Sequence, residues 1–121
     1  EGGVLGAVYE LLHASSAACG RELGCELDGA AIPVRPETSA ICAALDADPL
    51  RLIGSGALLV ATDRAEALVE ELATAGIPAA RIGRVTAEGG RWIAGTGGER
   101  RPLEPPAGDE LWRVRARLAA G

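Results

Sequence analysis

The chain has 121 residues, of which 48% are hydrophobic and 24% charged, and its formal net charge at pH 7 is −5. This composition is typical of one globular domain, spanning residues 1–121, and excludes a disordered tail or a two-domain enzyme within the chain itself. The pI of about 4.9 argues against a nucleic-acid partner, because such binding normally needs a basic face and a pI nearer ~9.

The first half of the chain predicts two helices and two strands. Apolar residues recur at helical spacing over residues 4–18, and Gly20 ends that helix. Residues 23–27 alternate between apolar and polar side chains, which predicts a strand with one buried face. A second helix begins at Pro36, a residue suited to the first helical position. The apolar run over residues 57–61 then predicts a central strand covered on both faces.

Two more helices are predicted in the second half, each from a capping signal. Asp63 is expected to cap the third helix, with Glu66 completing a capping box. The apolar stripe of this helix is Ala65, Leu68, Val69 and Leu72. Asp109 is expected to cap a last helix.

The remaining strands complete the fold class. Residues 80–85 and 91–94 have strand character, and the turn at residues 88–90 predicts that they pair as a hairpin. Residues 95–106 are rich in Gly and Pro and are expected to form a loop. The whole order predicts an α+β fold, with a mixed, mainly antiparallel sheet covered by helices and a partial likeness to ferredoxin-like layouts.

Cysteine usage and hydropathy indicate the compartment. Cys19, Cys25 and Cys42 are odd in number and form no C-x-x-C pair, so we expect buried thiols and not a disulfide framework or metal site. His13 is the single histidine, and no metal site is predicted. No apolar stretch is long enough to span a membrane, and the chain start has no basic signal region. We therefore expect a soluble, cytoplasmic protein with no membrane partner.

Two glycine groups are the candidate ligand-binding segments. Glu1, Gly2 and Gly3 stand directly before a helix, where free N–H groups and the positive helix end attract an anion such as phosphate. Gly54, Ser55 and Gly56 stand before the predicted central strand, and Ser55 adds a hydroxyl group. A plain turn remains the alternative at both places. No catalytic side chain is assigned, because no nucleophile and base, or carboxylate pair, stand out.

The ordered set of motifs resembles a known family. Residues 1–7 (EGGVLGA) are similar to the Gly-Gly helix start of the C-terminal domain of AIR (aminoimidazole ribonucleotide) synthase-related proteins. Within that group, three further segments resemble the hydrogenase expression/formation protein HypE: residues 31–38 (AIPVRPET), 48–59 (DPLRLIGSGALL) and 82–85 (IGRV). The resemblance covers most of residues 1–95, and it implies the fold of the AIR synthase (PurM) C-terminal domain.

The resemblance also implies a function. Such proteins are two-domain, ATP-dependent enzymes in which an N-terminal domain dimerises and carries most ligands of ATP and Mg2+. The present domain would form one wall of the phosphate-binding cleft, and Glu1, Gly2, Gly3, Gly54, Ser55 and Gly56 would be its cofactor-binding residues. The expected partners are the chain's own N-terminal domain, a second copy as a homodimer, and a small-molecule or protein substrate. The alternative is a stand-alone ligand-binding or assembly module without ATP-dependent chemistry.

Two features depart from the HypE pattern. The chain contains no Met, so we expect Glu1 to be an internal position or a trimmed terminus of a longer protein whose ATP-binding domain is absent here. It also ends at Gly121 without the terminal Cys on which HypE proteins dehydrate a thiocarboxamide to a thiocyanate. Either a tail is missing or the protein is a paralogue outside hydrogenase maturation, and we favour the paralogue. The resemblance further predicts that the two glycine groups converge, and that Gly3→Val or Gly56→Val in the full-length protein impairs nucleotide-dependent activity with little loss of folding.

Overall fold

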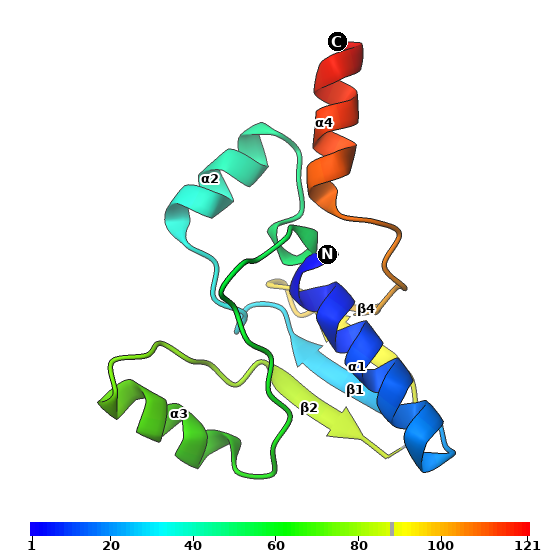
Figure 1. The fold of residues 1–121 in the computed structure, drawn as a ribbon, viewed down its shortest axis with the longest axis vertical. Coiled ribbons are helices and arrows are strands. Elements are labelled where there is room, and N and C mark those ends of the chain that lie inside the picture. The colour runs from blue at the N-terminus through cyan, green and yellow to red at the C-terminus, as the bar shows by residue number, and fades with distance from the viewer. Residues whose placement is uncertain (88) are drawn as a thin grey trace. The chain divides into compact units, whose positions relative to one another are not determined.

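The computed structural model describes residues 1–87 and 89–121, and these form two compact units. The helical unit consists of Glu1–Glu22, Val34–Leu59 and Leu103–Gly121, and the sheet unit of Leu23–Pro33 and Val60–Pro102. Figure 1 shows the elements of both units coloured in chain order.

Three α-helices and one short 3-10 helix make up the helical unit: α1 (Gly3–Cys19), α2 (Pro36–Ala44), η1 (Pro49–Arg51) and α4 (Glu110–Ala120). The expected end of α1 is confirmed, since Gly20 adopts a left-handed conformation with a φ of 69°. Leu5, Val8 and Leu12 of α1 are buried, and they follow one another at helical spacing. The first turn of α1 packs on η1.

The predicted starts of α2 and α4 are also confirmed. Pro36 occupies the first helical position of α2. The Asp109 side chain accepts a hydrogen bond from the Leu111 N–H at 3.0 Å and so caps α4. Val114 is the buried residue of α4, whereas Leu118 on the same helix is 63% exposed.

A four-stranded sheet organises the sheet unit, with the strand order β2-β1-β3-β4. The strands are β1 (Gly24–Asp28), β2 (Gly83–Thr86), β3 (Arg91–Ala94) and β4 (Arg100–Pro102). β1 pairs antiparallel with β2 and parallel with β3, while β3 pairs antiparallel with β4. Cys25, Leu27 and Ile93 are buried on one face of this sheet. The α+β class with a mixed, mainly antiparallel sheet is thereby confirmed.

The predicted hairpin between β2 and β3 is wrong, because β1 lies between them. The chain after β2 crosses β1, and the Cys25 N–H donates to the Gly90 carbonyl at 3.3 Å. Glu88, the first residue of the expected turn, lies outside the described residues. The expected loop also contains a strand, β4, which forms the hairpin with β3 instead. Local turn signals marked a change of direction but could not identify the strand's partner.

The central strand expected at residues 57–61 is wrong as well. Within the described residues this stretch belongs to no sheet, and Leu58 and Val60 are 88% and 51% exposed. The boundary between the two units falls after Leu59. An apolar run favours burial, but a strand also needs a neighbour that accepts and donates its backbone hydrogen bonds.

The third helix, α3 (Ala65–Thr74), forms in the sheet unit but starts differently from the prediction. Asp63 does not cap it; the Arg64 N–H donates instead to Thr62 Oγ1 at 3.1 Å, just before the helix. The four residues of its predicted stripe are half-buried. The phase of the stripe was therefore right and the depth of its burial was overestimated.

Burial of the cysteines agrees with the prediction at two positions. Cys25 and Cys42 are buried, and all three thiols are free. Cys19 is exposed, which corrects the expectation, because it is the last residue of α1 and its thiol faces the Ser16 and Arg21 carbonyls. Among the described residues, no helix combines the length and apolar character needed to cross a membrane.

Candidate functional site

The first glycine group lies where α1 begins. Gly2 is buried with a φ of 80°, Gly3 has a φ of 66°, and Glu1 is exposed. Both glycine conformations lie in the left-handed region, which side chains disfavour. These residues turn the chain into the helix.

Gly3 is also a point of close approach between two backbones. A Cβ atom at this position would lie 2.7 Å from the carbonyl carbon of Arg51 and 2.8 Å from its Cα, and would contact the Leu50 carbonyl oxygen. No side chain fits there without moving η1 away from α1. The expectation that Gly3→Val spares folding is therefore wrong.

The second glycine group is open to solvent. Gly54, Ser55 and Gly56 are all exposed. Gly56 has a φ of 82°, and no atom lies within 4 Å of a Cβ built on it, while a Cβ on Gly54 would be 3.9 Å from the nearest side-chain atom. A ligand can therefore approach this backbone closely.

One buried carboxylate joins the two glycine groups. Asp109 Oδ2 accepts the Gly2 N–H at 2.8 Å, and Oδ1 accepts the Ile53 N–H at 3.1 Å as well as the Leu111 N–H that caps α4. Asp109 is only 3% exposed. The start of α1 and the residue before Gly54 are thus held by opposite oxygens of the same side chain, which we name the Asp109 clamp.

The environment of Asp109 keeps it ionised. Burial opposes the charge, but the N–H groups of Leu111, Gly2 and Ile53 outweigh burial and lower the pKa of the carboxyl. The Gly2 N–H is consequently already given to an internal anion. The exposed backbone of residues 54–56 is the part of the predicted site that remains open to a phosphate.

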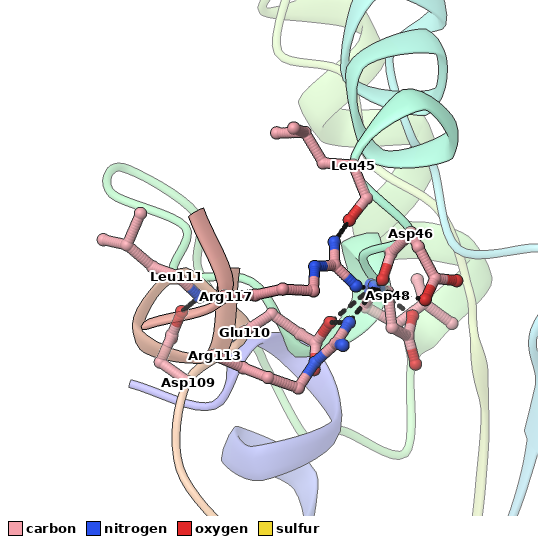
Figure 2. A network of polar contacts seen from close by, with 9 residues as sticks. Leu45, Asp46, Asp48, Asp109, Glu110, Leu111, Arg113 and Arg117 are labelled. Atoms are coloured by element: carbon pink, nitrogen blue, oxygen red, sulfur yellow. Dashed lines mark hydrogen bonds and ion pairs between the residues drawn. The ribbon is translucent and has the colours of Figure 1, made fainter. Parts of the chain in front are cut away.

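Glu110, the residue after Asp109, holds the start of the segment that leads through η1 to Gly54, as Figure 2 shows. Glu110 Oε2 accepts the Asp48 N–H at 2.9 Å, and Asp48 in turn accepts the Leu50 N–H at 2.9 Å, which caps η1. Arg113 donates to both oxygens of Glu110, at 2.9 and 2.7 Å. The hydrogen bonds from Arg113 and then from the Asp48 N–H lower the pKa of Glu110 to about 2.

Further contacts in Figure 2 tie α4 to the end of α2. Arg117 forms an ion pair with Asp46 at 3.2 Å and also donates to the Leu45 carbonyl. The Arg113 guanidinium donates to the Asp46 carbonyl. Arg113 and Arg117 of α4 are therefore bound to acidic groups and carbonyls of their own unit.

Sequence reasoning identified Asp109 as a helix cap and missed its other contacts. The cap is a local signal, since Leu111 lies two residues away. The bond to Gly2 joins positions 107 apart in sequence, and the bond to Ile53 joins positions 56 apart. Nothing in the spacing of residues predicts either of these contacts.

The sheet unit holds a separate, shallow hollow of about 260 Å3, lined by Glu26, Leu27, Trp92, Ala94, Gly98 and Arg100. The Arg100 guanidinium covers the Trp92 ring at 4.4 Å from its centroid. None of the predicted site residues lies there. Across the part of the chain that the structure describes, no group of three or more His, Cys, Asp or Glu residues could hold a metal ion.

Comparison with known proteins places the chain in one family. Residues 1–93 fit the family profile described as AIR synthase related protein, C-terminal domain. The chain is 36% identical over 113 residues to carbamoyl dehydratase HypE of Escherichia coli (strain K12), covering 90% of this chain and 33% of that protein. Two crystal structures of E. coli HypE, one described as a hydrogenase maturation protein, superpose with a TM-score of 0.71 at 34% identity. They cover 94% of this chain and 35% of the solved chains.

Proposed function

The chain belongs to the family of AIR synthase related protein C-terminal domains, and from this membership we propose that it forms one wall of the phosphate-binding cleft of a HypE-like, ATP-dependent enzyme. The chain spans 33% of the length of the curated relative that it matches. The proposed partners are therefore its own N-terminal domain and, for the whole protein, a second copy. ATP and Mg2+ are the proposed ligands of the whole protein, with the Mg2+ ligands outside this chain.

The proposed chemistry is the ATP-driven dehydration of a carbamoyl group. The γ-phosphoryl group of ATP moves to the carbamoyl oxygen and ADP is released. The carbon–oxygen bond then breaks with phosphate as the leaving group, and the nitrogen loses both protons, leaving a carbon–nitrogen triple bond. Phosphoryl transfer depends chiefly on positioning and charge stabilisation, which backbone N–H groups supply without acid–base side chains.

The observation that carries the proposal is the open backbone of residues 54–56 next to the Asp109 clamp. The clamp holds Ile53, so the exposed residues begin at a position held by a partly buried hydrogen bond to a buried carboxylate. Gly54 and Gly56 leave room for a phosphate to approach, and Ser55 offers a hydroxyl group. We propose Gly54, Ser55 and Gly56 as the phosphate contacts, with Gly2 and Gly3 supporting them and Glu1 at the rim.

A matched pair of glycine variants in the whole protein tests this function. Gly56 and Gly76 have φ values of 82° and 76°, and a Cβ on either meets no atom within 4 Å. Gly56→Ala and Gly76→Ala should therefore lose similar stability, about 1 kcal/mol each. We expect Gly56→Ala alone to raise the KM for ATP by about tenfold or more, a loss of about 1.4 kcal/mol in binding. Equal KM values for the two variants would contradict the proposal.

A stand-alone binding or assembly module is the second candidate function. It is favoured by one contact, because the Gly2 N–H at the helix start is already bound to Asp109 and is not free for a phosphate. The two candidates differ in a direct assay of the whole protein. ATP consumption that depends on Mg2+ and on a carbamoyl substrate supports the enzyme, and its absence supports the module. The isolated chain is expected to hydrolyse no ATP above the buffer rate under either function.

A further inference from the structure

The family profile matches residues 1–93, yet the side chain that joins the two glycine groups is that of Asp109, the N-cap of α4, beyond that match. We propose that Asp109 is a positioning residue of the phosphate-binding wall, setting the place of residues 54–56 relative to the start of α1. This inference rests on the proposed function. It assigns the geometry of the site to an element that lies outside the residues matched by the family profile.

The two carboxylate oxygens have separate tasks. Oδ1 accepts the N–H groups of Leu111 and Ile53, and Oδ2 accepts the N–H of Gly2. A helix cap needs only the bond to Leu111, which a side chain with one acceptor oxygen provides. The second oxygen therefore serves the contact between α4 and α1.

Asp109 and Glu110, the N-cap and the first residue of α4, hold the two ends of one short segment, residues 48–53. Glu110 accepts the N–H of Asp48, and Asp109 accepts the N–H of Ile53. Between these two points lies η1, whose backbone packs against Gly3. The segment that leads into Gly54 is thus held at its start, at its end and along its length.

The charge of Asp109 suits this position. Its carboxylate receives N–H groups from the starts of two helices, Gly2 at α1 and Leu111 at α4, where the helix dipoles favour an anion. A buried carboxylate with both oxygens hydrogen-bonded is held in one orientation, because breaking these bonds leaves its charge without partners away from water. The result is a rigid junction beside an open loop.

Asp109→Asn separates positioning from capping. Asparagine is a good helix cap and retains one acceptor oxygen for Leu111 and Ile53, but its NH2 group opposes the N–H of Gly2. In the whole protein, hydrogen exchange should become at least ~10-fold faster at the Gly2 amide and change less at Leu111. The KM for ATP should rise several-fold, with a smaller change in kcat. Asp63→Asn, which changes an exposed carboxylate in the sheet unit, should leave both quantities unchanged.

The outcomes separate this inference from the function on which it rests. If Gly2 exchange accelerates while the KM for ATP stays at the wild-type value, the positioning role is wrong. If the wild-type protein does not use ATP at all, the proposed function fails. Should Asp109→Asn not fold, exchange in the wild-type protein still decides, because the Gly2 and Ile53 amides must be protected together. Rapid exchange at either amide would overturn the clamp.

Discussion

Different kinds of interaction stabilise the helical unit and the sheet unit internally. In the helical unit, buried or partly buried carboxylates bind backbone N–H groups far away in sequence, such as Asp109 with Gly2 and Glu110 with Asp48. In the sheet unit, the strands are joined by their own backbone ladder, and the side-chain ion pairs are exposed. The side chains of Arg84 and Glu26, for example, are 63% and 46% exposed. Single acidic residues therefore determine geometry in the helical unit, whereas in the sheet unit they mainly add exposed ion pairs to a ladder formed by the backbone.

The largest effect is expected from Asp109→Ala. This change removes the acceptor of three N–H groups, two of which join segments distant in sequence. The free energy of unfolding should fall by about 3–5 kcal/mol, because one buried and two partly buried N–H groups are left without partners. Urea denaturation measures this loss. A loss below ~1 kcal/mol would show that the Asp109 clamp does not stabilise the fold. The helical unit would then depend on single carboxylates no more than the sheet unit does.

Gly3→Val should be the next most damaging change. The new side chain would meet the backbone of Arg51 and must also adopt a left-handed φ, so a loss of about 3 kcal/mol is expected. Gly20→Val is the matched control, because Gly20 has a φ of 69° but open space around its Cβ. It should lose only about 1–2 kcal/mol. Equal losses in thermal unfolding would refute the close contact between α1 and η1.

Features that depend on nearby residues could be predicted from the sequence, whereas features that depend on distant residues could not. The α1 end at Gly20, the start of α2 at Pro36 and the Asp109 cap were predictable, because each depends on residues within a few positions. The partners of β2 and β3 were not, because strand pairing is a choice among distant segments. The strand expected at residues 57–61 was wrong for the same reason, because a strand forms only where another segment pairs with it.

The candidate site, too, was predictable in its local features and not in its long-range contacts. Its glycine segments were visible as motifs, since positive φ and close approach demand glycine at Gly2, Gly3 and Gly56. The side chain that joins them was visible only as a cap. Its contacts with Gly2 and Ile53 depend on how α1 and α4 meet, which no local pattern records.

Acid should weaken the helical unit at pH values set by the carboxylates of Asp109 and Glu110. The pKa of Glu110 is lowered from 4.5 to about 2, and that of Asp109 is lowered as well. Depressed values mean that this stability is complete above the unfolded-state pKa and is lost as the pH falls through the folded-state pKa. Between about pH 4.5 and 2, Glu110 should account for a loss of about 1–2 kcal/mol, reduced by solvent screening at half-exposed Arg113.

Urea titrations of the wild type and Glu110→Gln across that range measure the acid effect. Glutamine keeps an acceptor for the Asp48 N–H but cannot titrate. The variant should therefore start less stable at neutral pH and lose less on acidification. Parallel pH profiles for the two proteins would exclude Glu110 as a source of the acid sensitivity.

The smallest effect is expected in the sheet unit. Glu26→Ala removes the ion pair with Arg84, whose bonds of 3.0 and 2.8 Å are well formed but exposed to solvent. Exposed pairs stabilise proteins by less than ~1 kcal/mol, and salt screens them. A loss in urea denaturation as large as that of Asp109→Ala would remove the distinction between the units.

The most direct test of the proposed phosphate-binding wall is an NMR titration of the isotope-labelled whole protein with Mg2+ and a non-hydrolysable ATP analogue. We expect the backbone amide signals of Gly54, Ser55 and Gly56 to shift most within this domain, while that of Gly76 in the sheet unit stays in place. Saturable binding that leaves the signals of residues 54–56 unmoved would show that these residues do not contact the phosphates.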